Sequence, residues 1–276
     1  MQPIIAPNIM TTAKLPTYFI SHGGGPWPYV PEMRAEMKML EASLVDIPRQ
    51  LGSIPRAILV ISGHWEESGF DVMSHPHPPM VYDYFGFPDY TYHIQYPAPG
   101  HPVLAQRTLE LLQSAGLQAK LNAEQGFDHG TFAPLFAMYP KADMPIFQVA
   151  LNANLDPKAH LALGRALAPL RDEGVLIVGS GLSYHNLRAY GPQAKLPAKA
   201  FDDWLQETLL TCTPAEREAR LIAWTTAPYA RQSHPREEHL IPLMAALGAA
   251  ADETATCVYH EEGIRGGVVA SSFRFG

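Results

Sequence analysis

Short apolar runs rich in β-branched residues recur along the chain, and each is typical of a strand. They span 17–20, 57–61, 146–151 and 175–178, with weaker examples at 257–259 and 268–270. Because nearly every position in the clearer runs is apolar, rather than every second one, we expect strands that are buried on both faces. Such burial is typical of a mainly parallel sheet covered by helices.

Stretches with hydrophobic residues at helical spacing lie between these runs. Met33, Met37 and Leu40 follow that spacing, and Pro157 suits the first turn of a helix. Strands that alternate with helices indicate βαβ units. The sequence contains no internal repeat and no linker, so we predict an α/β fold: a single three-layer α/β/α domain over residues 1–276 with a mainly parallel central sheet. The predicted helices span 31–51, 102–114, 156–170, 198–210 and 240–247.

The segment 74–99 shows neither the helical nor the strand period for long. It is rich in Pro, Tyr, His and Gly. A loop of this length inside a compact domain is usually functional, as a lid or a binding loop. We expect the part that carries Asp83, Tyr84 and His93 to cover a ligand, with aromatic side chains available to stack on a ring.

The composition is that of a globular protein with an acidic balance. Hydrophobic residues make up 47% of the 276 residues, which is enough for a sizeable core. The 20 Lys and Arg against 27 Asp and Glu give a net charge of −7, without the basic balance of a typical nucleic-acid binder. We therefore expect no nucleic acid among its partners.

We expect no targeting signal in this sequence, and it contains no CxxC pair of cysteines. Cys212 and Cys257 belong to no CxxC pair, so we predict free thiols in a reducing compartment. Residues 1–7 lack the basic and continuous apolar segments of a signal peptide. No apolar run approaches the roughly 18 residues that a membrane span needs. We expect a cytoplasmic protein with no membrane partner, either a monomer or a small homo-oligomer.

Histidines follow three of the predicted strands. His22, His64 and His185 each come shortly after a strand ends, in glycine-containing turns. Ligands of open α/β sheets bind outside the carboxyl ends of the strands. Any one of these residues could be a structural histidine held by hydrogen bonds, but three in the same topological position indicate a site.

Two further histidines lie in unusual contexts. His129 sits in a polar turn between Gly126 and Gly130, and His239 lies near the start of a predicted helix. Neutral imidazole is the commonest zinc ligand and also suits Fe(II), so several histidines without cysteine predict a site for zinc or non-haem iron. Asp128 could orient His129 from the neighbouring position. We interpret the remaining seven histidines mostly as loop or surface residues: His75, His77, His93, His101, His160, His234 and His260.

Rival catalytic motifs are incomplete. The run His22-Gly23-Gly24-Gly25 is similar to the oxyanion loop of esterases, which requires a G-x-S-x-G nucleophile elbow. Ser180 and Ser183 each lack one of the two glycines of that elbow. The chain also contains no G-x-G-x-x-G fingerprint, no phosphate-binding P-loop and no HExxH. A serine hydrolase, a dinucleotide-binding enzyme and a zincin protease are therefore disfavoured.

Several sequence blocks, in order along nearly the whole chain, resemble a known family. It is the class III extradiol ring-cleavage dioxygenases, in the branch named for 4,5-DOPA dioxygenase. Each block alone is a weak signal of the family, but all of them in this order and at similar spacing make the resemblance specific. The blocks are Ser21-His22-Gly23, Ser62-Gly63-His64-Trp65, 82–88, 96–100, 126–130, 180–187 and 238–243.

The resemblance implies a metal ion bound by His22, His64 and His239, with His185 as a fourth ligand or an acid–base residue. It also implies that His129 handles protons. Related enzymes bind Fe(II) with two histidines and a carboxylate, whereas here His239 takes the carboxylate position and Glu238 precedes it. An all-histidine site also suits zinc, so one divalent ion is expected, Fe(II) for activity or Zn(II) as bound.

The implied reaction is an oxidation that incorporates molecular oxygen. The enzyme would open the ring of a small aromatic diol of the catechol type with O₂, and His129 or His185 would accept a substrate proton. A zinc-binding hydrolase or a binding protein on the same fold remains the alternative, because a fold does not fix a function.

Overall fold

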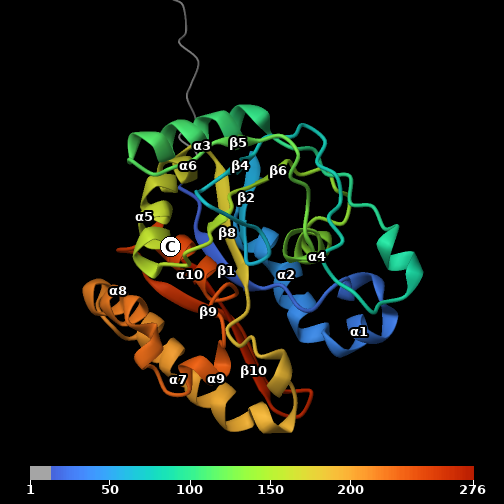
Figure 1. The fold of residues 1–276 in the computed structure, drawn as a ribbon, viewed down its shortest axis with the longest axis vertical. Coiled ribbons are helices and arrows are strands. Elements are labelled where there is room, and N and C mark those ends of the chain that lie inside the picture. The colour runs from blue at the N-terminus through green and yellow to red at the C-terminus, as the bar shows by residue number, and fades with distance from the viewer. Residues whose placement is uncertain (1–13) are drawn as a thin grey trace, which may run out of the picture.

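The computed structural model describes residues 14–276, and a six-stranded sheet forms its centre (Figure 1). The strand order is β6-β2-β8-β1-β10-β9. The first four strands are mutually parallel, whereas β10 runs antiparallel to both β1 and β9. The bounds are β1 Thr17–Ser21, β2 Ala57–Ser62, β6 Ile146–Gln148, β8 Val175–Gly181, β9 Ala255–Ile264 and β10 Val268–Phe275.

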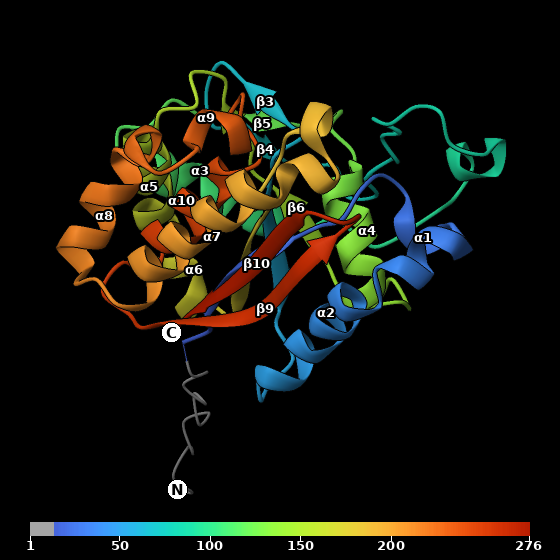
Figure 2. The ribbon, with the colours of Figure 1, turned by 90° about the horizontal axis from the view of Figure 1, so that it is seen from below.

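Helices cover both faces of this sheet. In Figure 2, α2 and α4 lie on one side of the sheet, and α5, α7 and α10 lie on the other. This arrangement confirms the predicted three-layer α/β class with a mainly parallel sheet. The helices are α1 Pro31–Glu36, α2 Lys38–Gln50, α3 Pro102–Ser114, α4 His129–Met138, α5 Pro157–Leu167, α6 Pro169–Asp172, α7 Lys195–Leu210, α8 Pro214–Ile222, α9 Ala230–Ser233 and α10 Ile241–Gly248.

Close packing of α10 on the sheet determines where its first turn lies. All eight residues of α10 are buried, and so are all residues of β1, β2 and β8. A Cβ on Gly179 of β8 would lie 2.2 Å from the carbonyl oxygen of Pro242, so only glycine permits this approach. The start of α10 is thereby held beside the carboxyl end of β8.

Some predicted elements divide in the structure. The helix expected over 31–51 breaks at Met37, whose φ of −102° and ψ of 27° are not helical. The helix expected over 156–170 becomes α5 and α6 because Pro169 has no N–H to continue the hydrogen bonding. The strand expected over 146–151 becomes β6 and the short β7 (Leu151–Asn152), which pairs with β3 (Glu66–Glu67).

The segment 74–99 is a loop, as predicted, and its single 3₁₀ turn covers Asp89–Tyr92. Val81 N–H donates to the carbonyl of Phe127 at 2.8 Å, next to the start of α4. The Phe87 ring lies so close to Gly25 that a Cβ there would be 2.6 Å away. The loop is therefore packed between the His22 turn and α4. The small sheet beneath it pairs β4 (Val72–Met73) with β5 (Leu121–Asn122).

The predictions on targeting and cysteine chemistry concern the N-terminus, the apolar runs and the two thiols. Residues 1–7, which we interpreted as unlike a signal peptide, lie outside the described residues. Within residues 14–276, no helix combines the length and apolar character needed to cross a membrane. Cys212 and Cys257 are both free, as predicted.

Candidate metal centre

Three histidines from distant parts of the chain converge at one edge of the sheet. His22 directly follows β1, His64 follows β2 by two residues, and His239 precedes α10 by two. Since β1 and β2 are parallel, their carboxyl ends meet at this edge. One possible ligand atom from each ring lies within 4.8 Å of the others.

The end of β8 joins the three histidine segments through backbone hydrogen bonds. The carbonyl of Gly181 accepts from His22 N–H at 3.1 Å, and the carbonyl of Ser180 accepts from Gly63 N–H, next to His64, at 3.0 Å. Leu182 N–H donates to the carbonyl of His239 at 3.0 Å. A Cβ on Gly181 would lie only 2.0 Å from that His239 oxygen. A glycine at this position therefore lets the His239 segment reach the strand ends.

The spacing and the hydrogen-bond partners of the ring nitrogens in His64 and His239 are compatible with a cation bound between them. Nε2 of His64 and Nε2 of His239 are 3.1 Å apart, while each Nδ1 faces a carboxylate. An ionised carboxylate only accepts hydrogen bonds, so each Nδ1 carries a proton, and the lone pair that a neutral ring offers is on Nε2, the atom that faces the other ring. Two nitrogen ligands of one tetrahedral zinc would be about 3.3 Å apart.

His22 completes the fit. Both of its ring nitrogens are buried and lack a hydrogen-bond partner within the described part of the chain. A buried polar atom without a partner is costly unless a ligand satisfies it. The ring nitrogens of His22, His64 and His239 therefore form a set of ligand atoms that could hold a divalent metal ion.

Asp83 joins His64 to His129. Its Oδ2 lies 3.1 Å from Nδ1 of His64, and its Oδ1 lies 2.8 Å from Nδ1 of His129. Oδ1 also accepts the backbone N–H of His129 at 3.1 Å. The Asp83 side chain is only 18% exposed, although the residue as a whole counts as exposed because its backbone lies at the surface. The loop 74–99 thus contributes a side chain to the site.

Glu238 joins His239 to His185 in a similar way. Its Oε1 lies 2.9 Å from Nδ1 of each ring. The two rings stack with centroids 3.5 Å apart and an interplanar angle of 25°. The nitrogens of His185 group with Glu238 and His239, not with His22 and His64. The geometry therefore places His185 beside the three-histidine set.

Burial and neighbouring charges set the pKa values in the cluster. Burial, reinforced by the neighbouring histidines, lowers the pKa of His22 and of His239 well below the usual range. Burial also lowers the pKa of His129, although Asp83 opposes that change. For His64, burial acts downward, but Asp83 and other carboxylates outweigh it and the pKa is raised. The pKa of Asp83 is lowered because its two histidine partners outweigh its burial. Neutral His22 and His239 suit metal binding.

All five histidines singled out in the sequence come together, but two carboxylates were not recognised as part of the site. Asp83 was expected only to cover a ligand, and Glu238 was noted only as a neighbour of His239. Asp128 does not orient the His129 ring: its Oδ1 accepts from Ser62 Oγ at 2.7 Å and from Thr131 N–H at 3.1 Å, as the N-cap of α4. No local spacing signal could have identified Asp83.

Two of the other seven histidines, which we interpreted mostly as loop or surface residues, do not lie at the surface. His160 and His234 are both fully buried. His160 accepts Asn152 N–H at Nε2, 3.2 Å away, and its Nδ1 lies 2.8 Å from the Asp156 carbonyl. His160 lies in α5 and His234 directly follows α9, and the sequence did not reveal the burial of either.

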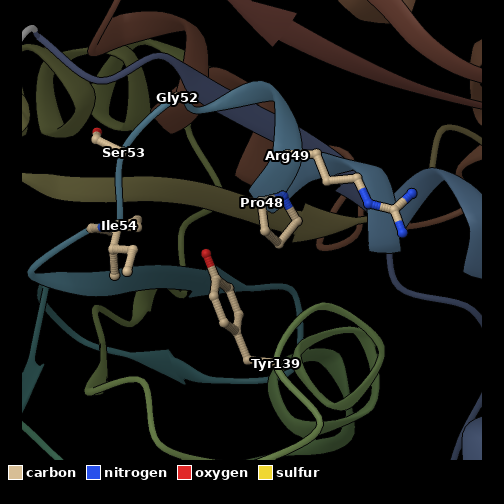
Figure 3. Close-up of a pocket in the computed structure, with 7 residues that line it drawn as sticks. Pro48, Arg49, Gly52, Ser53, Ile54 and Tyr139 are labelled. Atoms are coloured by element: carbon tan, nitrogen blue, oxygen red, sulfur yellow. The ribbon is translucent and has the colours of Figure 1, made fainter.

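A separate hollow of about 340 Å³ lies away from the histidines (Figure 3). It is bounded by the end of α2, the turn that precedes β2 and the residue after α4. These segments lie at the amino end of β2, opposite the histidine cluster. The residues that line it are Pro48, Arg49, Gly52, Ser53, Ile54, Pro55 and Tyr139.

Comparisons with known proteins identify a family of ring-opening dioxygenases that matches nearly the whole chain. Residues 16–272 match the family described as the catalytic LigB subunit of aromatic ring-opening dioxygenase. A 4,5-DOPA dioxygenase extradiol of Beta vulgaris is 39% identical over 263 residues, which cover 94% of this chain and 96% of that protein. The protein of the same name from Escherichia coli (strain K12) is 35% identical, with 90% of each chain covered.

A solved structure has the same fold. The crystal structure of an uncharacterized protein from Escherichia coli K12 superposes with a TM-score of 0.77 at 32% identity. The match covers 95% of this chain and 100% of that one. Similarity in sequence and similarity in fold therefore extend over almost the same residues.

Proposed function

Because this chain belongs to the extradiol aromatic ring-opening dioxygenase family, we propose that it cleaves the ring of a catechol-type substrate with O₂ at one Fe(II) ion held by His22, His64 and His239. The observation that carries this proposal is the arrangement of the three rings. One ring nitrogen of His22, which lacks a hydrogen-bond partner among the described residues, lies within 4.8 Å of ligand atoms on His64 and His239, whose Nε2 atoms are 3.1 Å apart. Fe(II) would supply the redox chemistry that O₂ requires, which Zn(II) cannot supply.

We assign proton transfer to His129 and His185. Burial lowers the pKa of His129, so the ring is neutral near pH 7 and can accept a proton from a catechol hydroxyl. His185 lies against His239 on the other side of the three-histidine set. With Nδ1 of each ring directed at a carboxylate, Nε2 is the nitrogen available for exchange with the substrate.

The loop 74–99 would exclude water and contact the substrate ring. Tyr84 is buried, and its ring centroid lies 5.9 Å from that of His129. Exclusion of water strengthens each electrostatic interaction within a site. In the proposed reaction, the carbon–carbon bond next to the diol breaks and both atoms of O₂ remain in the ring-opened product. O₂ is the only oxidant.

We infer that one catalytic domain spans the whole chain. The family match covers residues 16–272, and one six-stranded sheet joins Thr17 near its start to Phe275 near its end.

Anaerobic reconstitution with Fe(II), followed by addition of O₂ and a panel of catechols, tests the proposal. DOPA belongs in this panel because the relatives from Beta vulgaris and Escherichia coli carry its name. We expect O₂ uptake and a yellow ring-opened product with Fe(II), and neither with Zn(II). Hydrolysis by the zinc-loaded protein, without O₂ uptake by the iron-loaded protein, would favour the alternative of a zinc hydrolase.

A further inference from the structure

We propose that Asp83 and Glu238 are positioning residues, each of which locks one metal-binding histidine and one proton-transfer histidine in a shared orientation. This inference rests on the proposed function, because it assigns roles relative to the proposed metal ion. Two separate carboxylates make the same kind of connection. Asp83 connects His64 with His129, and Glu238 connects His239 with His185.

The two bridges use their oxygen atoms differently. Asp83 directs one oxygen to each ring, Oδ2 to His64 and Oδ1 to His129. Glu238 directs the single atom Oε1 to both rings at 2.9 Å. Within residues 14–276 its Oε2 has no hydrogen-bond partner, and it lies 3.7 Å from the Arg236 guanidinium. This difference determines which substitutions each bridge tolerates.

Each bridge fixes the tautomer of two rings. A carboxylate that accepts from Nδ1 requires the proton there and leaves the Nε2 lone pair free for a metal or for a substrate proton. If one ring of a pair rotates, the shared oxygen or carboxyl plane must move with it. The orientation of the ligand histidine is therefore coupled to that of its proton-transfer partner.

Asp83 also connects this coupling to the loop 74–99. The carboxylate accepts the backbone N–H of His129 in addition to the ring contact, so two hydrogen bonds hold the loop against the start of α4. The contact with Nδ1 of His64 holds the loop against the turn that follows β2. Displacement of the loop would remove the bridge between His64 and His129. The position of the loop and the orientation of the histidines at the proposed metal site thus depend on the same side chain, that of Asp83.

The test compares zinc affinity across variants of the full chain, measured by competition with a chromophoric chelator. In Asp83→Asn, one oxygen becomes an NH₂ group that can only donate, so one ring must carry its proton on Nε2. We expect about ten- to hundredfold weaker zinc binding. Glu238→Leu should lose a similar factor, whereas Glu238→Gln keeps an oxygen that can accept from both rings and should lose less.

Matched controls come from neighbouring carboxylates that do not reach the cluster. Asp89→Asn changes a carboxylate of the same loop that is 97% exposed, and Glu237→Gln changes the residue next to Glu238, which pairs with Arg231. Both should keep wild-type zinc affinity. Imidazole ¹⁵N NMR of the metal-free variants gives a second readout: Asp83→Asn should shift His64 or His129 toward the Nε2–H tautomer.

The outcomes separate this inference from the proposed function. One outcome would refute the bridges and leave the metal site intact: His22→Ala loses zinc affinity, while Asp83→Asn and Glu238→Leu keep both the affinity and the histidine tautomers of the wild type. Zinc affinity that His22→Ala leaves unchanged would contradict the metal site itself, and the bridges with it. Loss of affinity together with the tautomer shift supports the inference.

Discussion

The atoms around each ring nitrogen distinguish the histidines of this protein. Among the residues that the structure describes, His22 has no partner for either ring nitrogen. The four histidines beside it each face a carboxylate, and backbone groups satisfy both nitrogens of His160. The first pattern suits a metal ligand, the second a ligand or an acid–base group, and the third a structural role. Burial alone would not separate His22 from His160, because both are buried.

His160 predicts a specific pH dependence of stability. Burial lowers its pKa from 6.5 to about 4. Because the folded pKa lies below the unfolded one, the unfolded chain binds more protons, and stability falls as the pH drops from 6.5 towards 4. The contribution lost over this window is about 3 kcal/mol. His160→Gln should be less stable than the wild type at pH 8, and the difference should shrink towards pH 4 in urea unfolding. Parallel pH profiles for the two proteins would rule out this role.

The sequence correctly placed histidines at the carboxyl edge of the sheet where they follow a buried strand, because the end of a parallel strand fixes the position of the next residues. His22 and His64 were found because a polar residue just after a buried parallel strand must lie at the common carboxyl edge. Asp83 could not be found in this way. Its place at the site depends on how a long loop folds back against α4, and no period or spacing in that loop encodes this path.

At the scale of elements, continuous apolar runs located the strands well. The helices α4 and α8 were missed for different reasons. The residues of α4 are apolar on nearly all sides because the helix is buried, so no amphipathic period marks it. The helix α8 has a capping box between Thr213 and Glu216, a local signal that the prediction did not use. The breaks at Met37 and Pro169 shortened two predicted helices.

The close approach of β8 to the segment before α10 predicts the effect of one methyl group. In Gly181→Ala the new Cβ would lie 2.0 Å from the His239 carbonyl oxygen, so the backbone carrying His239 must move. We expect destabilisation by about 1–3 kcal/mol and a loss of metal affinity of roughly tenfold or more. Gly24→Ala is the control, because an added Cβ there would have no heavy atom of the described chain within 4 Å apart from its immediate neighbours. Equal zinc affinity in the two variants would show that this contact does not position His239.

At the scale of the whole molecule, a metal ion bound by the three histidines would stabilise the fold, because its ligands come from distant parts of the chain. His22 and His239 are far apart in sequence, and the metal can be held only when β1 and α10 are in place. A ligand at a hundred times its Kd stabilises the native state by about 2.7 kcal/mol.

Zinc should therefore raise the Tm of the protein. We expect an increase of about 5–10 °C at a zinc concentration a hundred times the Kd, measured by calorimetry after removal of metal with a chelator. His22→Ala should lose this increase, whereas His77→Ala, which removes an exposed histidine, should keep it. An equal increase in His22→Ala would mean that zinc stabilises the fold elsewhere.

Mass spectrometry of the product formed in ¹⁸O₂ tests the central claim most directly. The Fe(II)-loaded protein is mixed with a catechol under ¹⁸O₂, with the iron content verified beforehand. The account predicts a ring-opened product that retains both labelled oxygen atoms, and none from His22→Ala. Oxidation of the catechol without incorporation of label, or no turnover of any catechol in the panel by the iron-loaded protein, would contradict it.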